Sequence, residues 1–201
     1  MYMVVSHYAG GASDADEVTP KIERGFVPLL KQHPGFNGYA LVQTEQGDII
    51  AITLFHDSSS SAAFRPTVRP WMNANIPAVP EPADRFSGES KIHAMVAPKT
   101  GSDAQSLYCL VQRVENLPGR EIMGPIVQGI LARTQAVTGF RGAYHARSGE
   151  DESRGCGVVF FDTKQQANEA HEANLTILRE LQPNVRLRVV GSGQTRILAM
   201  A

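Results

Sequence analysis

Two histidines on predicted strands are the side chains of this sequence best suited to moving a proton. His7 lies near the end of a β-prone segment, in phase with Met3 and Val5, and His93 lies on a later strand. Histidine has an ordinary pKa of about 6.5, so either ring could serve as a general base near neutral pH. The alternatives are a strand-end histidine at a solvated rim for His7 and a histidine satisfied in a core or an interface for His93.

Five further side chains could bind a small molecule. Trp71, the single tryptophan, lies close to Asn75 on a predicted helix, so its indole could wall a cavity while the amide orients a ligand oxygen. A lone helical tryptophan is more often part of a core. The other three belong to a repeated pattern, and for the tyrosines the alternative is packing within a sheet. They are Tyr39, Tyr144 and Gln112.

The pattern is a long internal repeat. The segment FNGY at 36–39 returns as FRGAY at 140–144, an offset of 104 from 36 to 140, and GESKIHAM at 88–95 returns as GQTRILAM at 193–200, an offset of 105 from 88 to 193. At that second offset, Gln112 corresponds to His7 and Leu198 to His93. A period this long is one domain per copy, not a solenoid unit. We therefore predict two domains, residues 1–99 and 100–201.

Each copy is predicted to have the order βαββαβ of a ferredoxin-like unit, which is a four-stranded antiparallel sheet with both helices on one face. The strand at 49–56 is apolar on both faces, so the uncovered sheet face needs a partner. We expect an α+β fold in which the two sheets pack face to face as a closed or nearly closed barrel with helices outside. The other predicted strands are 3–8, 36–43, 86–96, 107–113, 140–147, 155–161 and 185–200, and the helices end near 32, 76, 137 and 181.

These segments resemble the dimeric α+β barrel superfamily that includes the antibiotic-biosynthesis monooxygenase-like domains. The resemblance covers nearly all of both copies, and a tandem copy resembles two subunits of the usual dimer joined in one chain. It is carried by PGFNGY at 34–39, LFHD at 54–57, Trp71, Asn73, Asn75 and Gly88.

The resemblance implies several functions, because the superfamily includes cofactor-free quinone-forming oxygenases, haem-degrading enzymes and lactone isomerases. We expect a cofactor-independent monooxygenase-like enzyme acting on a small aromatic or quinol-like substrate between the two sheets. His7 or His93 would be the base, Trp71 and Tyr39 the walls, and Gln112 a polar group in the pocket, as in haem-degrading members. The alternative is a non-catalytic small-molecule-binding or structural barrel.

No cofactor or metal is expected. The pair His171 and Glu172 lacks the second histidine of a zinc-protease helix, and the glycines at 191 and 193 open a strand rather than a helix. The only cysteines, Cys109 and Cys156, form no CxxC pair. Haem is a weaker expectation, because the second helix of the first copy has no histidine.

Composition excludes several partners. The chain has 201 residues, 42% of them hydrophobic and 19% charged, with a formal net charge of -1, as in ordinary soluble globular proteins. Such a charge provides no surface for nucleic acid or anionic lipid. The apolar run at 49–55 is too short to cross a membrane, and the N-terminus lacks the basic region of a signal peptide. We expect a cytoplasmic monomer with an internal pseudo-dimer that binds a small molecule, with further homodimerisation left open.

Overall fold

The computed structural model describes residues 1–11, 15–96 and 107–201, and the expected domain junction at 99–100 lies outside these ranges. The chain has a mixed α+β fold, and the order βαββαβ predicted for each half is confirmed. The first half contains β1 (Tyr2–Tyr8), α1 (Ala15–Lys21), a π-helical turn (Ile22–Phe26), α2 (Val27–Lys31), β2 (Phe36–Thr44), β3 (Ile49–Phe55), α3 (Ser58–Asn75) and β4 (Asp84–Met95). The second contains β5 (Tyr108–Glu115), α4 (Arg120–Ala136), β6 (Phe140–Ser148), β7 (Gly155–Phe161), α5 (Lys164–Leu181) and β8 (Arg186–Met200).

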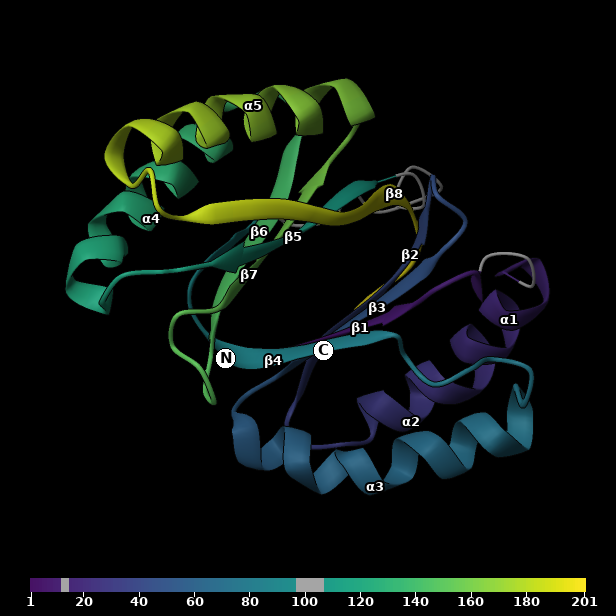
Figure 1. Cartoon of the computed structure of the whole chain (residues 1–201). Helices are drawn as coiled ribbons and strands as arrows, with labels where there is room; N and C mark the ends of the chain where they lie inside the picture. Colours follow the sequence, from purple (N-terminus) through teal and green to yellow (C-terminus); the bar gives the residue numbers. More distant parts are fainter. Residues whose placement is uncertain (12–14, 97–106) are drawn as a thin grey trace.

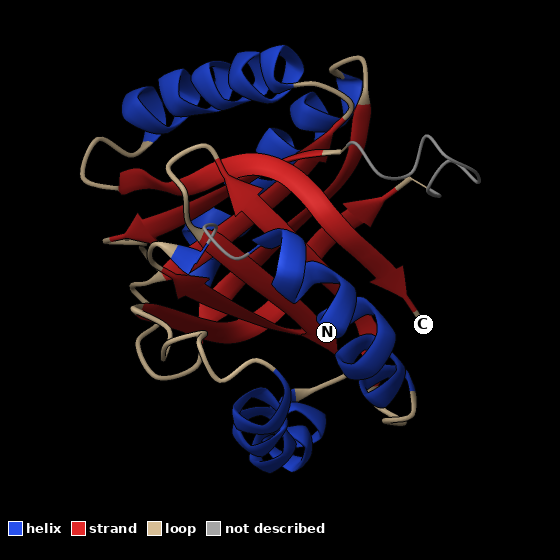
Figure 2. Ribbon diagram, turned by 90° about the vertical axis from the view of Figure 1, so that its right-hand side faces the viewer, coloured by secondary structure: helices blue, strands red, loops and turns tan. Residues whose placement is uncertain are grey.

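The strands form one closed antiparallel barrel in the order β1-β3-β2-β8-β5-β7-β6-β4. The two halves therefore join edge to edge, through β2 with β8 and through β4 with β6. Helices α1 to α3 cover one outer side of the barrel, and α4 and α5 cover the opposite side (Figure 1). Figure 2 shows the strands curving around the closed barrel. Closure pairs every edge strand, which removes the unpaired edges that two separate sheets would leave.

The repeated sequence segments form the two seams of the barrel. A Cβ atom on Gly38 of β2 would lie 3.1 Å from Sδ of Met200 on β8. A Cβ atom on Gly142 of β6 would likewise contact Sδ of Met95 on β4. Each seam thus has a glycine beneath a methionine from the other half. The similar segments of the two halves thus make equivalent contacts at the two seams.

A second pair of repeated glycines lets the backbones of these seams approach each other. A side chain on Gly88 of β4 would collide with the carbonyl of Arg147, and one on Gly193 of β8 would collide with the carbonyl of Gln43. Both glycines lie where the last strand of one half runs along the other half. Only glycine permits such close approach of two main chains.

The inside of the barrel is packed and mostly apolar, and its buried Arg113 bonds to Asp84 and to Sγ of Cys156. Alternation along β1 turns Met3 and Val5 inward and Tyr8 outward toward the helices. A small cavity in this core, beside Leu54 and Leu198, has a volume of about 10 Å³. This volume holds no more than about one water molecule. The expectation of a substrate cavity between the two sheets is therefore corrected, because the inward side chains fill that space.

The strand register also corrects the correspondence between His7 and Gln112. Tyr2 pairs with Phe55 in the first half as Tyr108 pairs with Phe161 in the second, so the first strands correspond at an offset of 106 (2 to 108). His7 then matches Arg113, and Gln112 matches Ser6. A shift of one residue turns a side chain to the opposite face of a strand, which explains the discrepancy.

The same rule separates Tyr39 from Tyr144. Tyr39 directly follows Gly38, whereas Tyr144 is the second residue after Gly142. Because the two glycines are structural equivalents at the seams, the tyrosines lie on opposite faces. Tyr39 packs with the helices of the first half, and Tyr144 packs inside the barrel.

Candidate functional site

A cavity of about 840 Å³ lies between the outer face of the first-half strands and the helices that cover it. This volume falls within the range of about 300–1,000 Å³ typical of small-molecule sites. Its walls are mostly apolar and aromatic, and its opening is polar. The sheet contributes Tyr2, Val4, Ser6, Tyr8, Tyr39, Leu41, Ala51, Thr53 and Phe55, the first helical segment Val18, Ile22 and Phe26, and α3 Phe64, Val68, Trp71 and Met72.

The helical segment formed by α1 and α2 is widened at the cavity. Within the π-helical turn, the Val27 N–H donates to the carbonyl of Ile22, five residues earlier. Pro28 follows directly and lacks an N–H of its own, so regular α-helical bonding is interrupted there. Such widened turns recur at functional sites. This one directs Ile22 and Phe26 into the cavity.

Helix α3 is fixed at both ends and presents Trp71 to the cavity. At its start, the Asp57 side chain accepts a hydrogen bond of 2.8 Å from the Ser60 N–H. Hydrogen bonds from Ser59 and Ser60 lower the pKa of Asp57 to about 2. At its end, the Asn75 amide donates to the carbonyl of Trp71 at 2.8 Å. Asn75 is therefore exposed at the helix terminus and lies outside the cavity lining.

Aromatic rings form one continuous wall. The ring of Phe26 lies 5.1 Å from that of Trp71, 5.9 Å from that of Tyr39 and 5.9 Å from that of Phe64, measured between ring centroids. The contacts with Tyr39 and Phe64 are edge to face, a favourable arrangement of aromatic quadrupoles. Trp71 and Tyr39, expected as walls, are thus brought together around Phe26.

Two phenolic hydroxyls provide polar groups inside this apolar cavity. Burial raises the pKa of Tyr39 far above its ordinary value, and burial also raises the pKa of Tyr8. The Tyr39 hydroxyl makes no hydrogen bond to another described residue, and the Tyr8 hydroxyl contacts Sδ of Met72 at 3.9 Å and interacts with the Ser6 side chain. Both groups remain protonated at neutral pH and can donate hydrogen bonds to a ligand oxygen.

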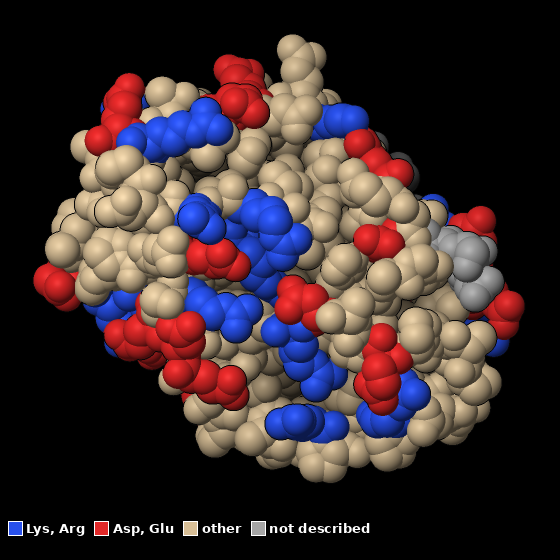
Figure 3. Space-filling model, viewed as in Figure 1, with Lys and Arg blue, Asp and Glu red and all other residues tan. Residues whose placement is uncertain are grey.

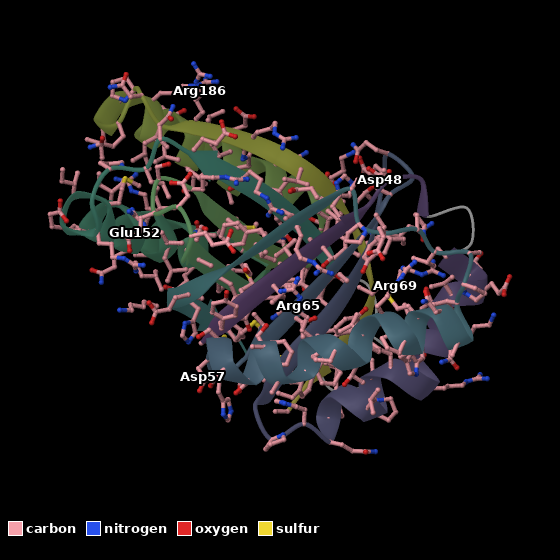
Figure 4. All side chains as sticks on the ribbon, turned by 60° about the horizontal axis from the view of Figure 1, so that its bottom comes forward. Asp48, Asp57, Arg65, Arg69, Glu152 and Arg186 are labelled. Carbon is pink, nitrogen blue, oxygen red and sulfur yellow. The ribbon has the colours of Figure 1, made fainter. Side chains whose placement is uncertain are left out.

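The mouth of the cavity is positively charged. Arg69 pairs with Glu81 at 2.9 Å, whereas Arg65, Arg85 and Arg154 have no ion-pair partner among the described residues. In Figure 4, Arg65 and Arg69 are labelled along the side of α3 that faces the strands. Basic side chains also run down the middle of the face shown in Figure 3. The opening can therefore attract an anion.

The second half completes this mouth through its β6–β7 loop. Ser148 at the end of β6 and Glu150 and Arg154 of the loop line the cavity, although the rest of the described lining belongs to the first half. Pairing of Ser148 with Gly88 at the seam brings the loop there. The loop is held in shape by the Ser148 hydroxyl, which accepts from the Glu150 and Asp151 N–H groups at 3.2 Å.

The structure places His7 outside the cavity. Its Nε2 lies 2.7 Å from Oδ2 of Asp48, whose other oxygen accepts a hydrogen bond of 2.7 Å from the Gly10 N–H. The pKa of Asp48 is lowered, first by the Gly10 N–H and to a lesser degree by His7. His7 thus ties the end of β1 to the β2–β3 turn.

His93 and Tyr144 also lie outside the cavity lining. The His93 side chain is exposed and stacks on Tyr144, with ring centroids 6.0 Å apart and planes at 13°. Tyr144 packs inside the barrel, where burial raises its pKa to about 12. Neither residue touches the space that a ligand would occupy in the first half.

Gln112 connects a helix to the sheet in the second half. Its Nε2 lies 2.8 Å from Nδ1 of His171 on α5. Counted from the helix N-caps Asp57 and Thr163, His171 corresponds to Arg65. Gln112 and His171 bind α5 to β5 in the second half. Ser6 and Arg65 occupy the equivalent positions in the first half, and both line the cavity.

Among the cavity residues that the sequence analysis missed are Tyr8, Arg65, Arg85 and Arg154. Alternation along β1 places Tyr8 on the same face as Tyr2, which was the available signal. Arg65 is one turn of helix from Arg69, and this spacing could have indicated a charged edge on α3. The sequence held no signal for Arg154, because a loop of the second half reaches the cavity only through barrel closure.

Among the described residues, no three His, Cys, Asp or Glu side chains are grouped to hold a metal ion. Cys109 and Cys156 are both free and buried, and burial raises the pKa of each thiol. In the described part of the chain no helix combines the length and hydrophobicity that a membrane crossing requires.

Comparison with known proteins identifies the architecture. No model of a known protein family matches the sequence, and no curated protein matches it. A solved structure of a candidate monooxygenase from Fusobacterium nucleatum subsp. nucleatum superposes with a TM-score of 0.73, at 11% identity over 99% of this chain and 94% of the other. A candidate monooxygenase from Lactobacillus acidophilus gives 0.71, at 8% identity over 99% and 95%. An anthrone oxidase-like protein gives 0.62, at 11% identity over 100% and 93%.

The chain has the dimeric α+β barrel fold. At identities of 8% to 11%, the likeness establishes the fold and does not by itself establish the reaction. In this barrel the cavity described above lies outside the strands of the first half, between the sheet and its helices.

Proposed function

We propose that the protein is a cofactor-independent monooxygenase-like enzyme that oxidises a small aromatic, anthrone- or quinol-like substrate in the first-half cavity. The observation that carries the proposal is an aromatic wall with two protonated phenols, Tyr8 and Tyr39, in a cavity of sufficient volume. The monooxygenase and anthrone oxidase names of proteins with the same fold support the class of reaction.

The chemistry requires an electron-rich substrate anion and molecular oxygen. For an anthrone, loss of one proton from the ring CH₂ gives a carbanion whose charge extends onto the carbonyl oxygen. The carbanion reduces O₂ and forms a C–O bond, which gives a hydroperoxide after protonation. Cleavage of the O–O bond with loss of the second CH₂ proton leaves a carbonyl on the ring and releases water. One oxygen atom enters the product, and the other leaves as water.

The cavity stabilises the anion in this scheme. Hydroxyl donors from Tyr8 and Tyr39 can hydrogen-bond the oxygen on which charge develops, as in an oxyanion hole. Trp71 and Phe26 hold the rings against the wall and exclude water. The cationic mouth favours the ionised form of the substrate, since nearby positive charge lowers the pKa of an acid.

The proton leaves through the mouth in this proposal, because the lining contains no histidine. Among the described residues, the carboxylates of the lining are Glu81, which pairs with Arg69, and Glu150. This replaces the expectation that His7 or His93 is the base. The same observation favours a second candidate function, a protein that binds an aromatic anion without turnover.

The test is the oxidation of 1,8-dihydroxyanthrone, followed by O₂ uptake and by the absorbance of the anthraquinone product. Metal chelator is present throughout, and the spontaneous oxidation rate is subtracted. We expect acceleration with one O₂ consumed per quinone formed, without release of hydrogen peroxide, and a loss of that acceleration in Trp71→Ala. A rate equal to the spontaneous one for this anthrone and for a hydroquinone would contradict catalysis and leave binding without turnover.

A further inference from the structure

We infer that the natural ligand of this cavity is an aromatic carboxylate, with its ring against Trp71 and Tyr39 and its carboxylate at the mouth. The inference uses the cavity of the proposed function and adds the substrate class. Three arginines, Arg65, Arg85 and Arg154, would bind the acid. Binding of an aromatic carboxylate can be measured whether or not the protein turns it over.

The charges of the lining are unbalanced. Four arginines and two glutamates line the cavity: Arg65, Arg69, Arg85, Arg154, Glu81 and Glu150. The pair formed by Arg69 and Glu81 at 2.9 Å cancels one charge of each sign. Among the remaining described lining residues, three positive charges face one negative charge. None of these four side chains forms an ion pair in the described parts of the chain. The pKa of Asp151, which lies outside the lining, is lowered first by hydrogen bonds from Ser153 and to a lesser degree by Arg154. Arg65 and Arg85 have no such carboxylate beside them among the described ion pairs, so an anion would supply the missing charge.

The three arginines come from separate elements. Arg65 lies on α3, Arg85 on β4, and Arg154 at the end of the β6–β7 loop. Each of these elements is fixed by other contacts: α3 by its Asp57 cap, β4 by pairing with β1 and β6, and the loop by its internal hydrogen bonds. The planar guanidinium group is well suited to a carboxylate, because its N–H donors match both oxygens.

The depth of the cavity decides where the acid lies. The inner wall is aromatic and aliphatic, and its hydroxyls at Tyr8 and Tyr39 are neutral donors. A carboxylate buried there would lose hydration without a countercharge, which is strongly unfavourable. At the mouth the same group meets three arginines and remains partly hydrated. A ligand with an apolar ring system and one acidic end fits both regions.

The second half acquires a role in specificity through this arrangement. Its loop supplies both an attractive group, Arg154, and a repulsive one, Glu150. Neutralising Arg154 should weaken carboxylate binding, and neutralising Glu150 should strengthen it. If these charges played no part in recognising the carboxylate, neutralising either residue would change the affinities for an acidic and a neutral ligand equally.

The experiment compares two ligands that differ at one group, 4,5-dihydroxyanthraquinone-2-carboxylate and its 2-hydroxymethyl analogue. Both are already oxidised, so binding is measured without turnover. Equilibrium dialysis gives Kd, and quenching of Trp71, the single tryptophan, reports occupancy of the cavity. The variants are Arg65→Gln, Arg85→Gln, Arg154→Gln and Glu150→Gln. Arg133→Gln on the exposed surface of α4 is the control for net charge.

We expect the wild type to bind the carboxylate about tenfold more tightly than the alcohol, with the preference reduced in high salt. Each arginine variant should weaken carboxylate binding by about three- to fivefold, as for partly exposed ion pairs, and leave the alcohol unchanged. Glu150→Gln should strengthen carboxylate binding, and Arg133→Gln should have no effect.

Equal affinities for the two ligands, unchanged by the arginine variants, would overturn the inference while leaving oxygenation of neutral substrates intact. A carboxylate preference without O₂ uptake would support the inference and overturn the proposed reaction. Binding of neither ligand would overturn both.

Discussion

Gly25 on the π-helical turn lies directly against Trp71 on α3. A Cβ atom on Gly25 would be 2.9 Å from Cζ2 of the indole ring, closer than carbon atoms can pack. The absence of a side chain at residue 25 therefore sets the position of the ring that walls the cavity. Gly129, which lies at the corresponding offset of 104 in the second half, has no atom within 4 Å of such a Cβ.

These two glycines make a matched pair of variants. Gly25→Ala should displace Trp71 and destabilise the protein by about 1–3 kcal/mol through overpacking. Gly129→Ala should stabilise α4 by about 0.5–1 kcal/mol, because alanine loses less backbone entropy in a helix. Urea unfolding measures both effects, and the Trp71 emission spectrum should change only in Gly25→Ala. Equal effects on stability would show that Gly25 does not position the ring.

Tyr39→Phe tests the phenol inside the cavity. Removal of one oxyanion donor should reduce the rate of anthrone oxidation by at least about tenfold, while stability changes little because the hydroxyl has no partner among the described residues. Tyr144→Phe is the control, since Tyr144 packs inside the barrel. An equal loss of rate in the two variants would place the reaction elsewhere.

His7→Gln tests whether His7 is structural. The imidazole bonds to Asp48 at 2.7 Å and lies outside the cavity lining, so anthrone oxidation should be unchanged. Stability should fall by about 1 kcal/mol with the loss of a side-chain hydrogen bond. The pH profile of the oxidation rate should also remain unchanged. A large loss of the oxidation rate in His7→Gln, at a stability that still keeps the protein folded, would restore His7 as the general base.

His145→Leu tests the acid sensitivity of the second half. Burial lowers the pKa of His145 to about 4, and its Nε2 has no hydrogen-bond partner in the described residues. The unfolded chain, with an ordinary pKa of about 6.5, binds a proton in the window between these values and the folded chain does not. The free energy of unfolding is therefore not reduced by His145 above the unfolded pKa. It decreases as pH falls from the unfolded pKa toward the folded one.

Leucine is the natural replacement, because Leu41 occupies the equivalent position in the first half at an offset of 104 (41 to 145). The urea midpoint of the wild type minus that of His145→Leu should decrease as pH falls from 7 to 4, because only the wild type carries this histidine. Parallel curves for the two proteins would show that His145 does not contribute to the pH dependence.

The fold followed from the sequence because its signals are local and repeated. Turn residues and apolar runs indicated the order βαββαβ twice, and a bare apolar sheet face required the second copy as its cover. The repeated glycine segments at 36–39 and 88–95 proved to be the seams of the barrel.

The location of the site could not be predicted in the same way, because it depends on which face each side chain occupies. The offset between the halves is 106 at β1 and 104 at β2, and a shift of one residue was enough to put Tyr39 in the cavity and Tyr144 in the core. Trp71 was predicted as a wall because its ring type and helical position are local properties. Arg154 was not, because its proximity arises only from barrel closure.

The most direct test of the central claim is a fluorescence titration of Trp71 with 1,8-dihydroxyanthraquinone, in wild type and in Ala51→Phe. Ala51 lies on the sheet floor of the cavity, where a phenyl ring would occupy the ligand space. We predict saturable quenching with one ligand per chain in wild type, and a loss of that quenching in Ala51→Phe with its folding unchanged. Quenching that is absent in wild type, or identical in the two proteins, would contradict a ligand site between the first-half sheet and its helices.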